Sequence, residues 1–278
     1  MQIGFLTAPF RNEPLDVVLE WASENGFQAL EVASGVGSRH IDPDQVLGGK
    51  AGEIKRAFRN HNLSISSLAA YGNLLVPDPD ERAKLVANFK RMIDAASALE
   101  VGVVCTLAGN AVPGKSKLQT IEQDFAEVFP GVVAYAKSKG VKIALENYFA
   151  TLTQGLETWD KIFEVCPDEN LGLNFDPSHL YWMQVDYLGA VERYASRIFH
   201  THAKDTEVKE HVRRHVGVLG GGWWRYVIPG YGNIDWGVYI ARLKAVGYDG
   251  VLSIEHEDHA LGREQGFIKG RQHLAQWV

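Results

Sequence analysis

Cysteine is scarce in this sequence, which contains only Cys105 and Cys166 and no C-x-x-C spacing. Neither thiol has a histidine or lysine beside it in the sequence that would activate it as a nucleophile. Two unpaired thiols are typical of a protein in a reducing compartment, so we expect a cytoplasmic protein.

Long apolar runs and basic clusters are also missing. No apolar run reaches the ~18 residues that a membrane-spanning helix needs, and the opening segment MQIGFLTAPF lacks the basic and apolar regions of a signal peptide. The 278-residue chain has a formal net charge of −6 and no basic surface suited to nucleic acid or an anionic membrane. We therefore expect a globular protein that binds neither.

A glycine-rich phosphate-binding fingerprint is absent after the first predicted strand, which argues against a doubly wound open sheet. Strand and helix patterns alternate instead. Strands are predicted over 3–7, 27–32, 63–69, 101–107, 141–146, 171–176, 198–203 and 250–255, each followed by a helix pattern. A (β/α)8 barrel needs about 250 residues, and no linker divides the chain. The sequence thus predicts a single (β/α)8 TIM barrel domain over residues 1–278.

Four of the predicted strands end on a side chain that can bind a metal. Side chains alternate across a strand, and one parity points into a barrel. By this rule Glu146, Asp176, His202 and Glu255 point inward at the carboxyl ends of strands five to eight, where barrel enzymes keep their chemistry. Three carboxylates packed there would repel one another, and a divalent cation removes that conflict. The mostly oxygen ligand set favours one Mn²⁺ or Mg²⁺ and also admits Co²⁺ or Zn²⁺.

Ordinary structural roles compete with this interpretation. Asp176 precedes Pro177 and can cap the next turn. His200 shares a face with His202 and fits a hydrogen-bonded interior residue. Matching parity on four consecutive strands favours the metal site over these alternatives.

Four segments, ALENY, NFDPSHL, HTHAKD and SIEHED, together resemble the xylose isomerase-like TIM barrel superfamily of sugar isomerases and epimerases, and PGYGNIDW is another feature of that group. The resemblance covers nearly the whole chain. It implies that Glu146, Asp176, His202 and Glu255 bind one divalent metal. It also implies that His179, the histidine of the D-x-x-H motif, contacts a substrate oxygen.

The chain departs from the ketose 3-epimerases of that group at one point. Those enzymes carry an arginine shortly after the metal histidine, whereas this chain has HAKD, with Lys204. The H-x-K-D form is also similar to inosose dehydratases and inosose isomerases. Arg225 is the candidate for the role of the missing arginine.

The predicted site suits a sugar isomerase or epimerase. A metal that holds the carbonyl and a neighbouring hydroxyl of a keto sugar would acidify the adjacent C–H by stabilising an enediolate. Glu146 and Glu255 are predicted to move the proton as an acid/base pair, while His179 and Lys204 orient substrate oxygens. Glu31, inward on strand two, either contacts a substrate hydroxyl or is a buried acid paired within the barrel.

Three other functions compete with that of a sugar isomerase or epimerase. If a leaving group stands beside the enediolate, proton abstraction ends in dehydration, so a lyase acting on a keto sugar or keto-inositol is the alternative. The DNA-repair endonucleases of this fold use more metal ligands and a basic groove, which the charge of −6 argues against. A non-catalytic sugar-binding protein would not need opposed carboxylates around a metal.

An aromatic segment, GGGWWRYVIPGYG, lies in the long loop after the seventh strand. Trp223 and Trp224 either close over a bound sugar or form a contact in a homo-oligomer, where Trp is enriched. Trp182, just after His179, is predicted to be a wall of the substrate pocket.

Overall fold

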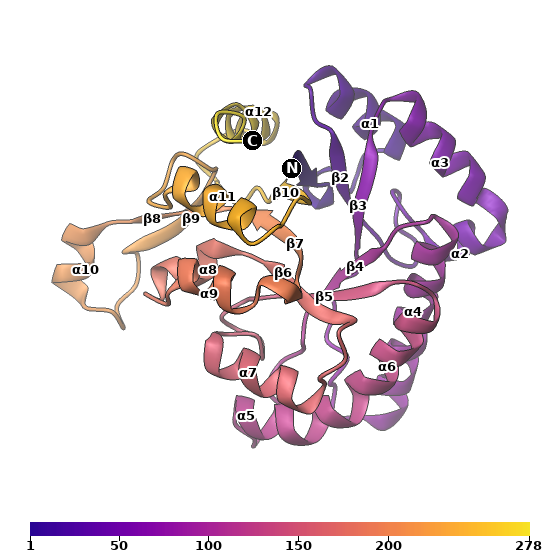
Figure 1. The fold of residues 1–278 in the computed structure, drawn as a ribbon, viewed down its shortest axis with the longest axis horizontal. Coiled ribbons are helices and arrows are strands. Elements are labelled where there is room, and N and C mark those ends of the chain that lie inside the picture. The colour runs from indigo at the N-terminus through magenta and orange to yellow at the C-terminus, as the bar shows by residue number, and fades with distance from the viewer.

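Hydrogen bonds between the first and last strands close the barrel (Figure 1). The computed structural model describes all 278 residues. The eight parallel barrel strands follow the order β1-β2-β3-β4-β5-β6-β7-β10, and β10 pairs with β1 from Gln2↔Val251 to Phe5↔Ile254. They are β1 (Gln2–Leu6), β2 (Ala29–Ala33), β3 (Ser64–Ala69), β4 (Val103–Thr106), β5 (Lys142–Glu146), β6 (Leu171–Phe175), β7 (Ile198–Ala203) and β10 (Val251–Ile254). The (β/α)8 barrel predicted from the sequence is confirmed.

Helices surround the barrel on its outer face, except α10, which lies away from it (Figure 1). The helices are α1 (Leu15–Glu24), α2 (Pro43–Gln45), α3 (Ala51–Asn60), α4 (Pro79–Ala98), α5 (Lys117–Thr120), α6 (Ala126–Ser138), α7 (Leu156–Val165), α8 (Pro177–Trp182), α9 (Tyr187–Arg193), α10 (Glu210–Val216), α11 (Trp236–Ala245) and α12 (Arg263–Leu274). The longest, α4, begins where the Asp78 carboxylate accepts the N–H of Glu81 and Pro79 occupies the first turn. No helix of the protein is long and apolar enough to span a membrane.

Pro130 lies inside α6. Proline removes one helical N–H and crowds the carbonyl four residues earlier. A wide helical turn over Ile121–Phe125 immediately precedes α6, and the helical path continues through it from α5. The chain thus stays helical past Pro130, and the helical geometry is distorted in the turn that precedes α6.

The long loop after β7 contains structure that the sequence did not predict. Residues 205–227, hereafter the arm, form β8 (Asp205–Val208), α10 and β9 (Trp224–Val227). The two strands pair antiparallel from Asp205↔Val227 to Val208↔Trp224, apart from the barrel sheet. Figure 1 shows the arm extending away from the barrel, at the left.

Asp205 fixes the base of the arm. Its buried carboxylate accepts the backbone N–H groups of Gly230, Gly232 and Ile234 and the indole N–H of Trp236. These bonds satisfy a charge that burial would otherwise penalise. They tie the segment PGYGNIDW to the start of the arm.

Polar side chains fill the upper interior of the barrel, as the strand parity predicts. Outward residues such as Leu145 and Phe175 are buried in the apolar layer against the helices. Asn174 and His200 are equally buried but lie side by side on β6 and β7. The register therefore assembles a hydrogen-bonded polar layer at the carboxyl ends of these strands.

Candidate metal centre

Four side chains meet at the carboxyl end of the barrel. Glu146 ends β5, Asp176 follows β6, His202 lies on β7, and Glu255 follows β10. One ligand atom from each lies within 4.8 Å of all the others. Nδ1 of His202 is 3.1 Å from Oε2 of Glu255 and 3.3 Å from Oε1 of Glu146. The structure thus brings together the four residues that the sequence predicted as metal ligands.

Two buried atoms of this cluster have no hydrogen-bond partner. They are Oδ2 of Asp176 and Nδ1 of His202, which lie 3.9 Å apart. Neither atom makes a hydrogen bond of good geometry, although Oδ2 lies 3.2 Å from Nζ of Lys204 and Nδ1 lies 3.1 Å from Oε2 of Glu255. A divalent cation is a partner that both a carboxylate oxygen and an imidazole nitrogen can bind. The residues present therefore fit a metal ion.

Asp176 uses its two carboxylate oxygens differently. Oδ1 accepts the N–H of Ser178 at 2.8 Å and caps α8. The amide of Asn147 accepts the N–H of Asp176 and donates to its carbonyl, at 2.7 Å each. The cap uses only Oδ1, so the two roles that the sequence left as alternatives are compatible within one side chain.

Glu31 lies behind His202 and orients its ring. Nε2 of His202 is 2.9 Å from Oε2 of Glu31, which also accepts the hydroxyl of Ser253, while Tyr71 donates to the other oxygen. Burial raises the pKa of Glu31, but the His202 and His200 rings and the hydrogen bonds from His202 and Tyr71 outweigh it and lower the pKa to about 2. An ionised Glu31 places the proton of His202 on Nε2 and leaves Nδ1 to face the carboxylates.

This position of Glu31 matches the buried, paired acid that the sequence gave as the alternative to a substrate contact. The carboxylate is fully buried and does not line the pocket described next. His200, deeper in the barrel, bonds to Asn174 and Ser66. Burial lowers the pKa of His200 to about 4, so this ring is neutral at pH 7.

A pocket of about 310 Å³ opens beside the four predicted ligands. It is lined by Tyr71, Leu107, Glu146, Tyr148, His179, Lys204, Tyr226, Glu255 and Glu257. His179 is buried, with Nε2 3.4 Å from Oδ2 of Asp176 and Nδ1 2.5 Å from the hydroxyl of Tyr226. The predicted substrate residue His179 therefore lies between the ligand cluster and the pocket wall.

Lys204 is fully buried among carboxylates. Its Nζ donates to Oε2 of Glu255 at 2.6 Å and lies 3.2 Å from Oδ2 of Asp176 and 3.5 Å from Oε2 of Glu257. Burial lowers the pKa of Lys204, but these carboxylates outweigh it and hold the pKa well above its usual value. The pocket therefore contains an ammonium group, charged at neutral pH, that contacts two of the predicted metal ligands.

Arg225 and Trp182 lie further from the cluster. The Arg225 guanidinium pairs with Glu207 at 2.5 Å and with Asp258 at 2.8 Å, and it does not line the pocket. Trp182 stacks on Trp224, with ring centroids 4.3 Å apart, and its indole N–H donates to the hydroxyl of Tyr226. Substrate contacts for Arg225 and Trp182 stay predictions. Trp182 supports the wall of the pocket through its hydrogen bond to Tyr226, which lines the pocket.

Five residues of the pocket lining were not predicted from the sequence: Tyr71, Leu107, Tyr148, Tyr226 and Glu257. Tyr71 follows β3 by two residues, and Tyr226 lies on β9, a strand that was not predicted. Glu257 follows Glu255 at the same parity within the quoted segment SIEHED, so the rule that found Glu255 could have found it. No sequence signal pointed to Tyr226, because its place depends on how the arm folds back.

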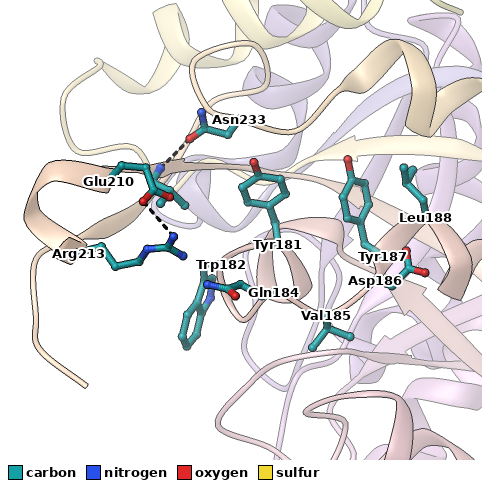
Figure 2. A pocket seen from close by; sticks show the side chains of 11 residues that line it. Tyr181, Trp182, Gln184, Val185, Asp186, Tyr187, Leu188, Glu210, Arg213 and Asn233 are labelled. Carbon is teal, nitrogen blue, oxygen red and sulfur yellow. Dashed lines mark hydrogen bonds and ion pairs between the residues drawn. The ribbon is translucent and has the colours of Figure 1, made fainter. Parts of the chain in front are cut away.

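A larger cleft of about 550 Å³ lies outside this site, between α8, α9 and the arm (Figure 2). Its lining includes Tyr181, Val185, Leu188, Glu210 and Arg213 but none of the four predicted ligands. The predicted ligands Glu146 and Glu255 line the smaller pocket instead.

Metal binding is expected to release about one proton per chain near neutral pH. Burial lowers the pKa of His202, but the carboxylates of Glu31, Glu255 and Glu146 outweigh it, so in the metal-free protein the pKa lies well above the ordinary value. A metal needs the unprotonated Nδ1. Raising the pH should therefore strengthen binding, about tenfold per pH unit, until the raised pKa is passed. Calorimetric Mn²⁺ titrations in two buffers of different ionisation enthalpy measure the number of protons that are released. Identical heats of binding in the two buffers would contradict this expectation.

Comparison with known proteins gives a consistent picture. A family model described as xylose isomerase-like TIM barrel matches residues 19–277. The uncharacterized protein YfiH of Bacillus subtilis (strain 168) is 28% identical over 314 residues, which cover 100% of this chain and 99% of YfiH. An inosose dehydratase of Clostridium perfringens (strain 13 / Type A) is 26% identical over 241 residues, which cover 80% of this chain and 79% of that enzyme.

Among solved structures, the IolI protein crystallised with a bound zinc atom matches this fold with a TM-score of 0.77. The two chains are 21% identical, and the match covers 100% of this chain and 99% of that one. At this identity the likeness shows the shared fold.

Proposed function

Because the chain belongs to the xylose isomerase-like TIM barrel family, we propose that it is a divalent-metal-dependent isomerase or epimerase of keto sugars. One observation carries the proposal. Glu146, Asp176, His202 and Glu255 converge beside a pocket, and two of their buried atoms lack a hydrogen-bond partner.

Glu146, Asp176, His202 and Glu255 would hold the metal, one ion per chain. Three carboxylates and one imidazole suit Mn²⁺ or Mg²⁺ and also admit Zn²⁺ or Co²⁺. The IolI structure, which shares this fold, holds a zinc atom. When bound, the ion would supply a Lewis acid that polarises the carbonyl oxygen of the substrate.

Glu146 and Glu255 would transfer the proton. They come from β5 and from the end of β10, with β6 and β7 between them, so they reach the pocket from different strands. Burial raises the pKa of Glu255, but Lys204 and His202 outweigh it and hold the pKa well below its usual value. Glu255 therefore stays ionised and can accept a proton from a carbon next to the carbonyl. Returning a proton from the other carboxylate inverts that carbon.

His179, Lys204 and Tyr226 would orient the substrate oxygens. Lys204 Nζ lies 3.2 Å from Nε2 of His179, whose other nitrogen contacts the Tyr226 hydroxyl. Donors held in fixed positions by their neighbours stabilise charge that develops on a substrate oxygen. This row of polar groups faces the same pocket as the two carboxylates.

A dehydratase is the second candidate, and two observations favour it. The similarity to an inosose dehydratase extends over 80% of the chain. The buried, charged Lys204 also lies in the pocket, where its ammonium group can donate a proton to a departing hydroxyl. Removal of the C–H proton by a carboxylate and loss of that hydroxyl with the Lys204 proton would release water and leave a new C=C bond.

The two candidates give different products in deuterated water. Metal-stripped protein reloaded with Mn²⁺ would be incubated with a panel of ketoses, aldoses and keto-inositols and followed by NMR. Deuterium at a single carbon together with a new epimer or isomer would support the isomerase. Signals of an enone or a diketone would instead favour the dehydratase.

The control is the same incubation without added metal. Exchange that proceeds equally well in the stripped protein would overturn the metal-dependent mechanism for both candidates. Absence of exchange with every carbonyl compound in the panel, in protein that has bound Mn²⁺, would count against both reactions for these substrates.

A further inference from the structure

A second hollow adjoins the pocket of the candidate metal centre. This outer hollow measures about 420 Å³ and is lined by Arg225, Tyr226, Glu257 and His259. Tyr226 and Glu257 also line the inner pocket of about 310 Å³ beside the predicted metal ligands, so the two spaces meet at these side chains. Ligand pockets typically occupy about 300–1,000 Å³. The inner pocket is at the lower end of that range, and the outer hollow has room for a second unit joined to the first.

Two segments that are held together form the outer hollow. Arg225 and Tyr226 belong to β9 of the arm. Glu257 and His259 belong to the loop that follows β10. An ion pair joins the two segments, since Nη1 of Arg225 donates to Oδ1 of Asp258 at 2.8 Å and the Asp258 side chain is only 1% exposed. The hollow is therefore pre-formed, which lowers the entropic cost of binding a ligand there.

The charges around the outer hollow favour a neutral ligand. The guanidinium of Arg225 is already paired with two carboxylates, Glu207 at 2.5 Å and Asp258 at 2.8 Å. Glu257 adds a third carboxylate, and Lys204, which lies 3.5 Å from it, is shared with two of the predicted metal ligands. An anionic group such as a phosphate would have to compete for cations that are already paired.

The polar groups of the outer hollow suit hydroxyl groups. Nε and Nη1 of Arg225 donate to the two carboxylate partners, while Nη2 donates no hydrogen bond within the chain. The carboxylate of Glu257 accepts hydrogen bonds, and a ring nitrogen of His259 can donate or accept one. Sugar hydroxyl groups do both. The ring of Tyr226 lies between the two spaces, and aromatic rings pack well against apolar C–H groups.

We propose that the outer hollow is a subsite for a neutral sugar unit, so that the substrate is a keto sugar joined to a second sugar by a glycosidic bond. The keto sugar occupies the inner pocket beside the predicted metal ligands. The second sugar lies in the outer hollow, where Arg225 and His259 contact its hydroxyl groups. This inference rests on the proposed function for the identity of the inner unit, but binding tests it separately from turnover.

Calorimetric titration of the full chain, equilibrated with Mn²⁺, compares D-fructose with four of its glucosides. These are turanose, maltulose, leucrose and palatinose, which carry glucose on different oxygens of the same ketose. At least one glucoside is expected to bind about tenfold more tightly than fructose or better, because the added unit forms hydrogen bonds in the outer hollow. Fructose 6-phosphate, which adds a charged group instead, is expected to bind no more tightly than fructose.

Two histidine variants show where the second unit binds. His259→Ala is expected to reduce the preference for the glucoside over fructose by at least about threefold, because one hydrogen-bonding group of the outer hollow is lost. His215→Ala is the matched control, since His215 is an exposed histidine on α10 that lines neither space. This variant is expected to keep the preference of the wild type.

The proposal would be overturned if no glucoside bound more tightly than fructose, or if fructose 6-phosphate bound more tightly than every glucoside. An equal preference in His259→Ala and His215→Ala would overturn the placement of the second unit. Proton exchange into the same sugars in deuterated water is recorded separately. Preference for a glucoside without exchange would support the subsite and count against the isomerase, whereas exchange without that preference would support the isomerase and overturn the subsite.

Discussion

Replacing Glu146 by glutamine is expected to lower turnover by about 10²- to 10⁴-fold, the usual range for removal of a general acid or base. The amide keeps the size of the side chain but cannot accept a proton. Glu255→Gln is expected to fall in the same range, because both carboxylates line the pocket beside His202. Turnover would be measured at saturating Mn²⁺, with the bound metal quantified in each sample, so that loss of the ion and loss of the base are separated.

Glu257→Gln is the matched control for these two variants. Glu257 lines the same pocket but is not among the four side chains whose ligand atoms converge. Its replacement removes one negative charge from the pocket without removing a predicted base, and we expect a loss of less than about tenfold. If Glu146→Gln, fully loaded with metal, turned over no more slowly than Glu257→Gln, Glu146 would have no role in proton transfer.

Replacing Lys204 by methionine is expected to destabilise the metal-free protein by about 3–5 kcal/mol, since it leaves buried carboxylates without their cation. Lys204 Nζ is 2.6 Å from Glu255 and 3.2 Å from Asp176, both predicted metal ligands. The same substitution should tighten Mn²⁺ binding by at least about tenfold, because a competing positive charge is gone. Urea unfolding with and without Mn²⁺ measures both effects.

Lys161→Met serves as the control for the loss of a lysine. Lys161 pairs with Glu122 and Glu164, whose side chains are 50% and 67% exposed. Ion pairs between exposed side chains contribute little to stability, so the control should unfold nearly as the wild type does. Equal destabilisation by both substitutions, or weaker Mn²⁺ binding in Lys204→Met, would show that Lys204 does not balance the charge of the site.

The barrel and the convergence of the four predicted ligands were accessible from the sequence because both depend on a simple alternation. A strand that ends on Glu146 or on His202 points that side chain inward whatever the details of packing. The carboxyl ends of parallel barrel strands must meet at one rim. Local pattern and topology together were therefore enough to place these residues near one another.

The contacts that orient the site could not be obtained in this way. Glu31 bonds to His202 across the barrel, from strands that are not neighbours in the sheet, and side-chain parity does not say which acid meets which ring. Tyr226 reaches His179 because the arm turns back as an antiparallel pair. The pattern of that segment, broken by glycines and tryptophans, gave no sign of paired strands. The role of Asp205 at the base of the arm depends on the same tertiary arrangement.

Titration of metal-stripped protein with Mn²⁺, followed by the electron paramagnetic resonance of the free ion, tests the account most directly. One saturable site per chain is expected in the wild type. In Asp176→Asn the carboxylate charge at Oδ2 is lost while an oxygen can remain to cap α8, so the site should bind at least about tenfold more weakly. Absence of a saturable site in the wild type, or unchanged affinity in Asp176→Asn, would contradict the assignment of Glu146, Asp176, His202 and Glu255 as a metal centre.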